Sequence, residues 1–180
     1  MRIVLSAVNL AYDKPTRMSG ATVDSKMSAR GNDGNINPDS LDNSCVATPG
    51  TADYEWWSVD LLATYMVRNV QFVARIDAAS ERLKNIFIYT TRVFDPANVN
   101  TLKYDLCYNQ TSAIPKGHIK PLYCTVLSVG RYVVIMKKTS NRDPLEFCEM
   151  EVYGKPYDGK ITNYSLNSYV PCGYMNPFSQ

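Results

Sequence analysis

The sequence predicts an all-β protein, an antiparallel β-sandwich or jelly roll with short loop connections. Stretches rich in β-branched and aromatic residues recur along its 180 residues, separated by loops of Gly, Pro, Asn and Asp. No segment has the apolar spacing of an amphipathic helix of three turns. The length fits one domain with a short appendage. We expect the domain at residues 1–154 and a C-terminal tail at 155–180, because the tail is rich in Tyr, Asn and Ser and poor in aliphatic residues.

Four segments have the composition and the boundaries of strands. They cover residues 66–75, 83–92, 130–137 and 147–154. In the first of them apolar residues return at alternate positions, which is typical of a strand covered on one face. The segment 30–39 is too polar and too rich in glycine for a strand or a helix, so we expect a loop there.

Trp56 and Trp57 stand next to a Val-Asp-Leu strand. A tryptophan side chain can bury roughly 200 Å². The simpler interpretation therefore places both in the core or between sheets. The alternative is that one of them faces solvent and stacks on a sugar.

Charge and histidine content exclude several function classes. The chain carries 19 Lys+Arg against 17 Asp+Glu, and its basic residues are scattered, so we do not expect a nucleic-acid partner. No run approaches the ~18 apolar residues of a membrane span. A catalytic triad or a multi-histidine zinc site would have to use His118, the single histidine, which we expect in an exposed loop. No CxxC pair occurs and no carboxylate pair stands out, so we expect no enzyme.

Other features favour a secreted protein. Asn109 and Asn163 stand in glycosylation sequons, and the chain has 5 Cys and 13 Tyr. The start of the chain lacks a full-length apolar segment, so we expect no complete signal peptide within the sequence itself. Five cysteines allow about fifteen ways of forming two disulfides, so the residues alone leave the pairing open.

An ordered series of short motifs resembles the F-type lectin (fucolectin) family, whose fold is a discoidin-like β jelly roll. The resemblance covers about residues 8–154 and implies a carbohydrate-binding module. The motifs are Val8-Asn-Leu-Ala-Tyr-Asp-Lys-Pro15, Asn32-Asp-Gly-Asn35, Ser44-Cys45, Glu55-Trp-Trp-Ser-Val-Asp-Leu61, Arg75-Ile-Asp77 with Arg82-Leu83, Gly130-Arg-Tyr-Val133 and Cys148-Glu-Met-Glu-Val-Tyr153.

The resemblance implies a structural calcium ion. Calcium binds six to eight oxygen atoms, and a tight Asp-Gly-Asn turn can present a carboxylate and carbonyls to one point. Taken alone, that motif is more often a plain turn. The implied ligands are the carbonyls of Arg30, Asn35 and Cys148, the side chains of Asp33 and Glu149, and Ser44.

The resemblance also implies the disulfides Cys45–Cys148 and Cys107–Cys124. The first would tie the calcium loop to the last strand, and closing a loop of roughly 100 residues stabilises a fold by about 4.7 kcal/mol in the chain-entropy model. Cys172 is left over, as a free thiol or as an intermolecular link in a homo-oligomer.

For the sugar site the resemblance implies Arg75, Asp77 and Arg82. Guanidinium groups donate paired hydrogen bonds to sugar oxygens, and a nearby carboxylate holds them in position. Without the resemblance, the same three residues would be interpreted as a surface salt bridge.

The sugar site departs from the family pattern in two ways. Where the family has a histidine just after Ser-Cys, this chain has Ala47 or Thr48. Where the family often has two adjacent cysteines, it has Ala78-Ala79. A lost hydrogen bond to a buried partner costs about 1–3 kcal/mol, which is about fivefold to more than a hundredfold in affinity. We therefore expect weakened fucose binding, or binding of a different or larger glycan.

The sequence thus predicts a secreted, calcium-stabilised, non-catalytic module that binds fucosylated or related glycans. The alternative is an extracellular structural, adhesive or protein-recognition module that has lost fucose binding. The Tyr-rich tail and the odd Cys172 favour this alternative. Membrane binding through loop tips is less favoured, because no exposed loop rich in Trp and Phe is evident.

Overall fold

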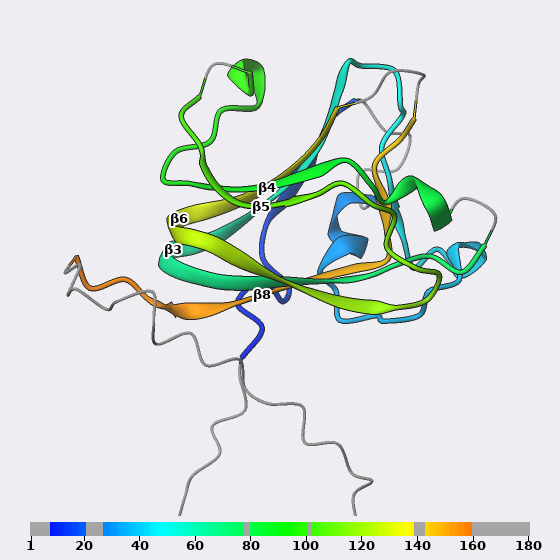
Figure 1. The fold of residues 1–180 in the computed structure, drawn as a ribbon, viewed down its shortest axis with the longest axis horizontal. Helices are drawn as coiled ribbons and strands as arrows, with labels where there is room; N and C mark the ends of the chain where they lie inside the picture. Colours follow the sequence, from blue (N-terminus) through cyan, green and yellow to red (C-terminus); the bar gives the residue numbers. More distant parts are fainter. Residues whose placement is uncertain (1–7, 21–26, 78–79, 101, 139–142, 160–180) are drawn as a thin grey trace, which may run out of the picture.

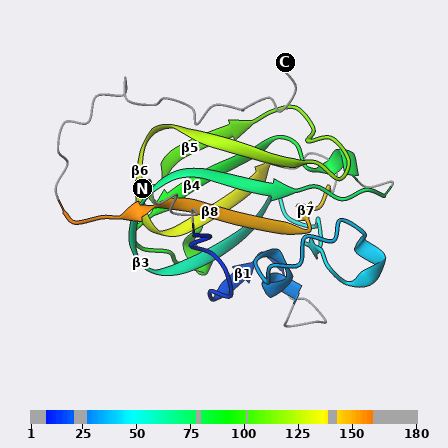
Figure 2. The same ribbon diagram turned by 90° about the horizontal axis from the view of Figure 1, so that it is seen from below.

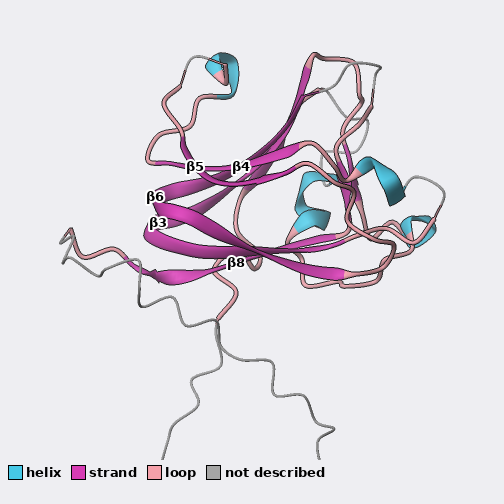
Figure 3. Cartoon of the chain, in the orientation of Figure 1, coloured by secondary structure: helices cyan, strands magenta, loops and turns pink. Residues whose placement is uncertain are grey.

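The computed structural model describes residues 8–20, 27–77, 80–100, 102–138 and 143–159. Strands form the body of this part of the chain, and its helical segments are short 3₁₀ turns (Figure 3). The strands are β1 (Thr16–Met18), β2 (Val46–Ala47), β3 (Tyr54–Val73), β4 (Ile86–Thr91), β5 (Asp105–Gln110), β6 (Ile119–Lys138), β7 (Glu146–Phe147) and β8 (Glu149–Pro156). The 3₁₀ turns are η1 (Met27–Gly31), η2 (Ser40–Asp42), η3 (Ser80–Arg82) and η4 (Pro96–Asn98). The all-β prediction is confirmed.

The two long strands β3 and β6 organise the fold. They pair antiparallel along most of their length, from Tyr54 opposite Lys138 to Val73 opposite Ile119. The sheet has the order β1-β3-β6-β4-β5, and β8 pairs with the second half of β3. Figures 1 and 2 show β8 running beside β3. A separate short ladder joins β2 to β7.

Strand β3 turns a corner midway. Its pairing with β6 shifts register between Asp60 and Tyr65, and at the corner Leu62 has φ +65° while its N–H donates to Asp60 Oδ1 at 2.8 Å. A positive φ is uncommon outside glycine, and irregularities of this kind bend a strand. The predicted strands around Trp57 and at 66–75 are therefore two halves of one strand.

The core lies between these two halves. Trp57 from the first half and Phe72 from the second each meet the ring of Phe147 edge to face, with ring centroids 5.4 Å apart in both cases. The three side chains belong to one buried cluster. Edge-to-face packing adds stabilisation beyond the buried area alone, so Phe147 ties the two layers together.

The C-terminal end of the described fold is β8. It ends at Pro156, where Lys155 and Pro156 still pair with Met66 and Tyr65. Strand β8 thus extends two residues beyond the predicted domain end at 154, and the predicted tail lies outside the described residues from 160 onward. Cys172 and the sequon at Asn163 lie there as well.

None of the helical segments described is long and apolar enough to cross a membrane.

Candidate functional site

The segment that carries Arg75 follows β3 directly. Backbone hydrogen bonds fix it on two sides, because Ala74 N–H donates to the carbonyl of His118 at 3.1 Å and Ile76 N–H donates to the carbonyl of Pro38 at 3.1 Å. The turns η1, η2 and η3 lie at this same end of the strands, whereas η4 lies apart, in the connection between β4 and β5 (Figure 3).

Acceptors surround the guanidinium of Arg75. Its Nε donates to Asp77 Oδ1 at 3.1 Å, and its Nη2 donates to Asp77 Oδ2 at 2.5 Å and to Ser40 Oγ at 2.8 Å. Its Nη1 lies 2.8 Å from Glu146 Oε1, and its side chain is only 13% exposed. Burial opposes the charge, but the bond to Asp77 and the charge of Glu146 outweigh it and raise the pKa of Arg75. Arg75 is therefore held in one orientation and stays charged.

Arg82, on η3, also pairs with Glu146. Its Nη1 lies 3.3 Å from both oxygens of Glu146, and its side chain is 47% exposed. Burial raises the pKa of Glu146, and Arg75 and Arg82 only partly offset that effect. One carboxylate with 7% exposure thus orients two guanidinium groups, of which Arg82 is the more accessible.

A buried lysine fixes the loops behind Arg82. Lys137 Nζ donates to the carbonyls of Arg82 at 2.5 Å and Pro144 at 3.0 Å, and pairs with Asp143 Oδ2 at 2.7 Å. Burial lowers the pKa of Lys137. We call the whole group the arginine cluster, and it consists of Arg75, Asp77, Arg82, Lys137, Asp143 and Glu146.

The structure separates the two candidates for the missing histidine position. Thr48 is buried, and its N–H and Oγ1 are both bonded to the backbone of Leu145, at 3.0 and 2.9 Å. Ala47 lies opposite Glu146 in the β2–β7 ladder. Directly opposite residues project to the same face of an antiparallel pair. Ala47 therefore faces the arginine cluster and Thr48 does not, while Ala78-Ala79 lie outside the described residues.

Sequence reasoning missed Glu146. It precedes a predicted strand and sits two residues before Cys148. The available signal was a charged side chain in an otherwise apolar Leu-Glu-Phe-Cys segment, since a buried charge needs a partner.

Two of the predicted calcium ligands, Asp33 and Glu149, come together at the loop that follows η1. Gly34 has φ +82°, which favours glycine, and Asn35 N–H donates to Asp33 Oδ1 at 2.8 Å within the turn. Gly34 N–H also donates to Glu149 Oε1 at 3.3 Å, which links the turn to β8. At Gly31 a Cβ would lie 2.8 Å from the Phe147 ring, so the loop packs directly on the core.

Glu149 has the chemistry of a cation ligand. It is fully buried, and its Oε2 has no hydrogen-bond partner within the described part of the chain. Burial and the nearby Asp33 raise the pKa of Glu149 to about 8. An unpartnered buried carboxylate beside a second carboxylate is costly unless a cation joins them. The chemistry of Asp33 and Glu149 therefore fits a cation such as calcium.

The remaining predicted ligands are backbone atoms and Ser44. Ser44 is buried next to Cys45 and its hydroxyl donates to the carbonyl of Asp39 at 2.7 Å. The described residues hold no group of three His, Cys, Asp or Glu side chains placed for a metal ion. A cation here would need carbonyl oxygens such as those predicted for Arg30, Asn35 and Cys148.

The disulfide predictions are confirmed. Cys45 bonds to Cys148 across a sequence separation of 103, and Cys107 bonds to Cys124 across 17. His118 is exposed in a loop, as expected, and Asn109 of the first sequon is exposed on β5.

Comparisons with known proteins agree with this architecture. Residues 30–135 match the family of NedA-like, galactose-binding domains. A fucolectin from Anguilla anguilla is 31% identical over 120 residues, which is 67% of this chain and 72% of that protein.

Two solved structures have similar folds. The crystal structure of an F-lectin (fucolectin) from striped bass (Morone saxatilis) serum matches with TM-score 0.70 and 28% identity, over 83% of this chain and 49% of that chain. A fucose binding module of Streptococcus pneumoniae matches with TM-score 0.65 and 25% identity, over 86% and 100%. The chain thus spans about half the length of the striped bass lectin.

These relatives are lectins and binding modules, which confirms the expectation of a non-catalytic module. The match of sequence family, relative and fold together leads to one assignment. The chain belongs to the fucolectin (F-type lectin) family and has its discoidin-like, galactose-binding domain fold.

Proposed function

We propose that this chain is a secreted, calcium-stabilised lectin that binds fucosylated or related glycans at the arginine cluster. The observation that carries the proposal is the pair of guanidinium groups, Arg75 and Arg82, oriented by the single buried carboxylate of Glu146. Rigid donors of this kind suit the hydroxyl and ring oxygens of a sugar, since little entropy is lost when they bind.

The charge balance of the cluster favours a neutral ligand. Ion pairs join three cations, Arg75, Arg82 and Lys137, to three carboxylates. A site that binds phosphate or a carboxylate has an excess of positive charge when the ligand is absent. A neutral, hydroxyl-rich saccharide needs no such excess.

Each residue has a distinct role in the proposed site. Arg82, the accessible guanidinium, donates to sugar oxygens, and the partly exposed Asp77 accepts from a hydroxyl. Arg75 adds a fixed positive charge behind them, and Glu146 holds both arginines. Ala47 supplies no hydrogen bond where the family has a histidine, so we expect fucose affinity roughly tenfold or more below that of a histidine-bearing relative.

Calcium completes the fold in this proposal. Asp33 and Glu149 would contribute carboxylate oxygens, and Arg30, Asn35, Ser44 and Cys148 would contribute the remaining oxygens. The bound ion would supply the positive charge that Glu149 lacks within the described chain. Secretion is supported by the two disulfides, which persist in oxidising compartments, and by the serum origin of the striped bass relative.

A glycan array run in calcium and again in chelator tests the proposal. We expect fucosylated or related glycans to bind the wild type, with the signal reduced at least tenfold in Arg82→Ala and Arg75→Ala. Arg131→Ala is the matched control, because Arg131 is a surface arginine of similar exposure, 42%, paired with Asp60 on another part of the fold.

Two outcomes would contradict the sugar site. One is an array without hits from a folded, calcium-loaded protein, which would favour a protein-recognition or adhesive module. The other is glycan binding that Arg75→Ala and Arg82→Ala leave unchanged. Circular dichroism of each variant separates a lost site from a lost fold.

A further inference from the structure

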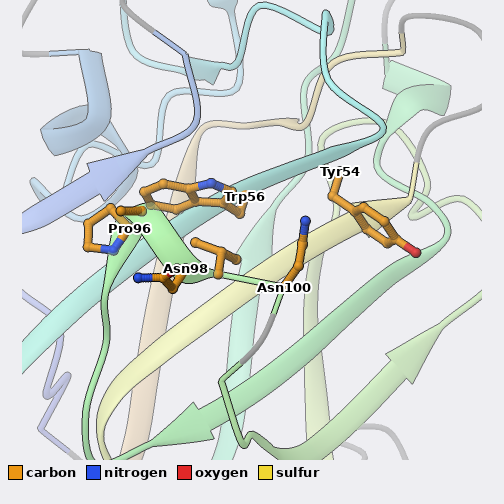
Figure 4. A pocket seen from close by; sticks show the side chains of 7 residues that line it. Tyr54, Trp56, Pro96, Asn98 and Asn100 are labelled. Atoms are coloured by element: carbon orange, nitrogen blue, oxygen red, sulfur yellow. The ribbon is translucent and has the colours of Figure 1, made fainter.

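A hollow of about 330 Å³ lies beside β3, away from the arginine cluster. It is at the lower end of the size range of small-molecule sites. In Figure 4 the indole of Trp56 lies next to Pro96 and Asn98, and Asn100 stands between Trp56 and Tyr54. The complete lining is Tyr54, Trp56, Pro96, Ala97, Asn98, Val99 and Asn100.

The hollow and the arginine cluster are on opposite faces of the main sheet. On β6, Met136 pairs with Trp56 and Lys138 pairs with Tyr54. Lys137, between them, reaches the carbonyl of Arg82 at 2.5 Å. Because successive strand residues point to opposite faces, the Trp56 side chain projects away from the cluster.

The same alternation separates the two tryptophans. Trp57 is fully buried and its Nε1 donates to the carbonyl of Ser28 at 2.8 Å, so it is a core residue as predicted. Trp56 is only partly buried and lines the hollow. Phe94 holds its ring edge to face, with centroids 5.2 Å apart. Trp56 is thus a supported aromatic surface next to solvent.

Amide groups lie beside this aromatic surface. Asn98 and Asn100 are exposed at the end of η4. Asp95 Oδ2 accepts from Asn98 Nδ2 at 2.6 Å and Asp95 Oδ1 accepts from Ala97 N–H at 3.0 Å. The carboxylate therefore positions both the turn and the Asn98 amide.

The chemistry of the lining selects a ligand class. None of the described residues that line the hollow carries a charge, which disfavours phosphates and carboxylates. A sugar ring has one apolar C–H face and a rim of neutral hydroxyls. That face matches the indole, and the rim matches amides, which both donate and accept.

We infer that this hollow is a second saccharide-binding site, in which a pyranose ring stacks on Trp56 and bonds to the amides of Asn98 and Asn100. The site is independent of the one proposed at the arginine cluster. Two sites on opposite faces allow one domain to hold two glycan chains at once, which raises avidity on a glycan surface.

The test uses ¹⁵N-labelled protein with Arg75→Ala, so that the first site is disabled. Free hexoses, L-fucose and N-acetylhexosamines are titrated to about 100 mM while the Trp56 indole and the Asn98 and Asn100 amide signals are followed. We expect at least one sugar to shift these signals saturably, with a Kd of about 1–10 mM. Asn100→Ala should weaken that binding about tenfold, and Trp56→Ala should abolish it. Tyr123→Ala, which removes an exposed aromatic on β6, is the matched control and should change nothing.

Asn100→Ala changes an exposed loop residue, so it keeps the test decisive if Trp56→Ala fails to fold. The inference is overturned if no sugar shifts these signals, if Asn100→Ala and Tyr123→Ala behave alike, or if only a proline-rich peptide produces the shifts. If the arginine cluster binds no sugar, wild type and Arg75→Ala will bind the same sugars with equal affinity. The Trp56 signals will still report on the second site in that case.

Discussion

Two buried glutamates stand on either side of Cys148 and are satisfied in different ways. Glu146 on β7 has two arginines against its oxygens. Glu149 on β8 accepts from the backbone N–H of Gly34 at Oε1, has no partner for Oε2 in the described structure, and lies near the charge of Asp33. A buried carboxylate needs a compensating charge. Arg75 and Arg82 supply that charge for Glu146, whereas in our proposal calcium supplies it for Glu149. The arginine cluster is therefore formed without a ligand, and the loop that follows η1 is completed by the ion.

The largest expected effect on stability comes from removing the Cys45–Cys148 disulfide, which joins the two parts of the structure that hold Glu146 and Glu149. Replacing Cys45 and Cys148 by Ala should reduce the free energy of unfolding by about 4–5 kcal/mol, because the bond closes 103 residues. Replacing Cys107 and Cys124 is the matched control, with an expected loss of about 3 kcal/mol for 17 residues. Denaturant unfolding in calcium measures both, and equal losses would contradict the assignment of the larger role to the Cys45–Cys148 bond.

Glu149→Gln should raise the free energy of unfolding of the metal-free protein, whereas Glu146→Gln should lower it. A carboxyl pKa raised to about 8 means that the folded state binds more protons than the unfolded state near neutral pH. Metal-free wild type should therefore lose stability as pH rises from about 4.5 to about 8, and Glu149→Gln should not. At pH 7 the variant should be about 2–3 kcal/mol more stable than wild type in chelator and should lose the stabilisation by calcium. Thermal unfolding with and without calcium checks this, and a variant that still responds fully to calcium would rule out Glu149 as a ligand.

Glu146→Gln should lower the free energy of unfolding, although burial raises the pKa of Glu146 as well, because Glu146 is paired with two guanidinium groups and Glu149 with none among the described residues. The amide leaves Arg75 and Arg82 without their shared carboxylate, although Asp77 still holds Arg75. We expect a stability loss of about 2 kcal/mol that calcium does not restore, and weaker glycan binding. Chemical denaturation and glycan titration measure the two effects. A variant with full stability and full affinity would show that the arginines orient themselves without Glu146.

Parts of this fold followed from sequence patterns and parts did not. Alternating residues indicated the strands, but the corner at Leu62 is formed by a non-glycine residue with positive φ, so no glycine or proline signal marked it. Glu146 becomes a site residue only because β7 pairs with β2 and passes Arg75, which is a long-range contact. The expectation that both tryptophans lie in the core held for Trp57 but not for Trp56, which is only partly buried, because adjacent strand residues face opposite sides.

The smallest expected effect comes from restoring, at the arginine cluster, the histidine that the family pattern has and this chain lacks. Ala47 faces the arginine cluster from the position opposite Glu146, so Ala47→His would place an imidazole beside both guanidinium groups. One added hydrogen bond to a sugar hydroxyl should raise fucose affinity about tenfold, or about 1.4 kcal/mol. Thr48→His is the control, and it should lower stability without raising affinity because Thr48 is buried and bonded to Leu145. Isothermal titration with L-fucose measures both variants. If Ala47→His binds no better than wild type, the arginine cluster is arranged for a ligand other than the one its histidine-bearing relatives hold.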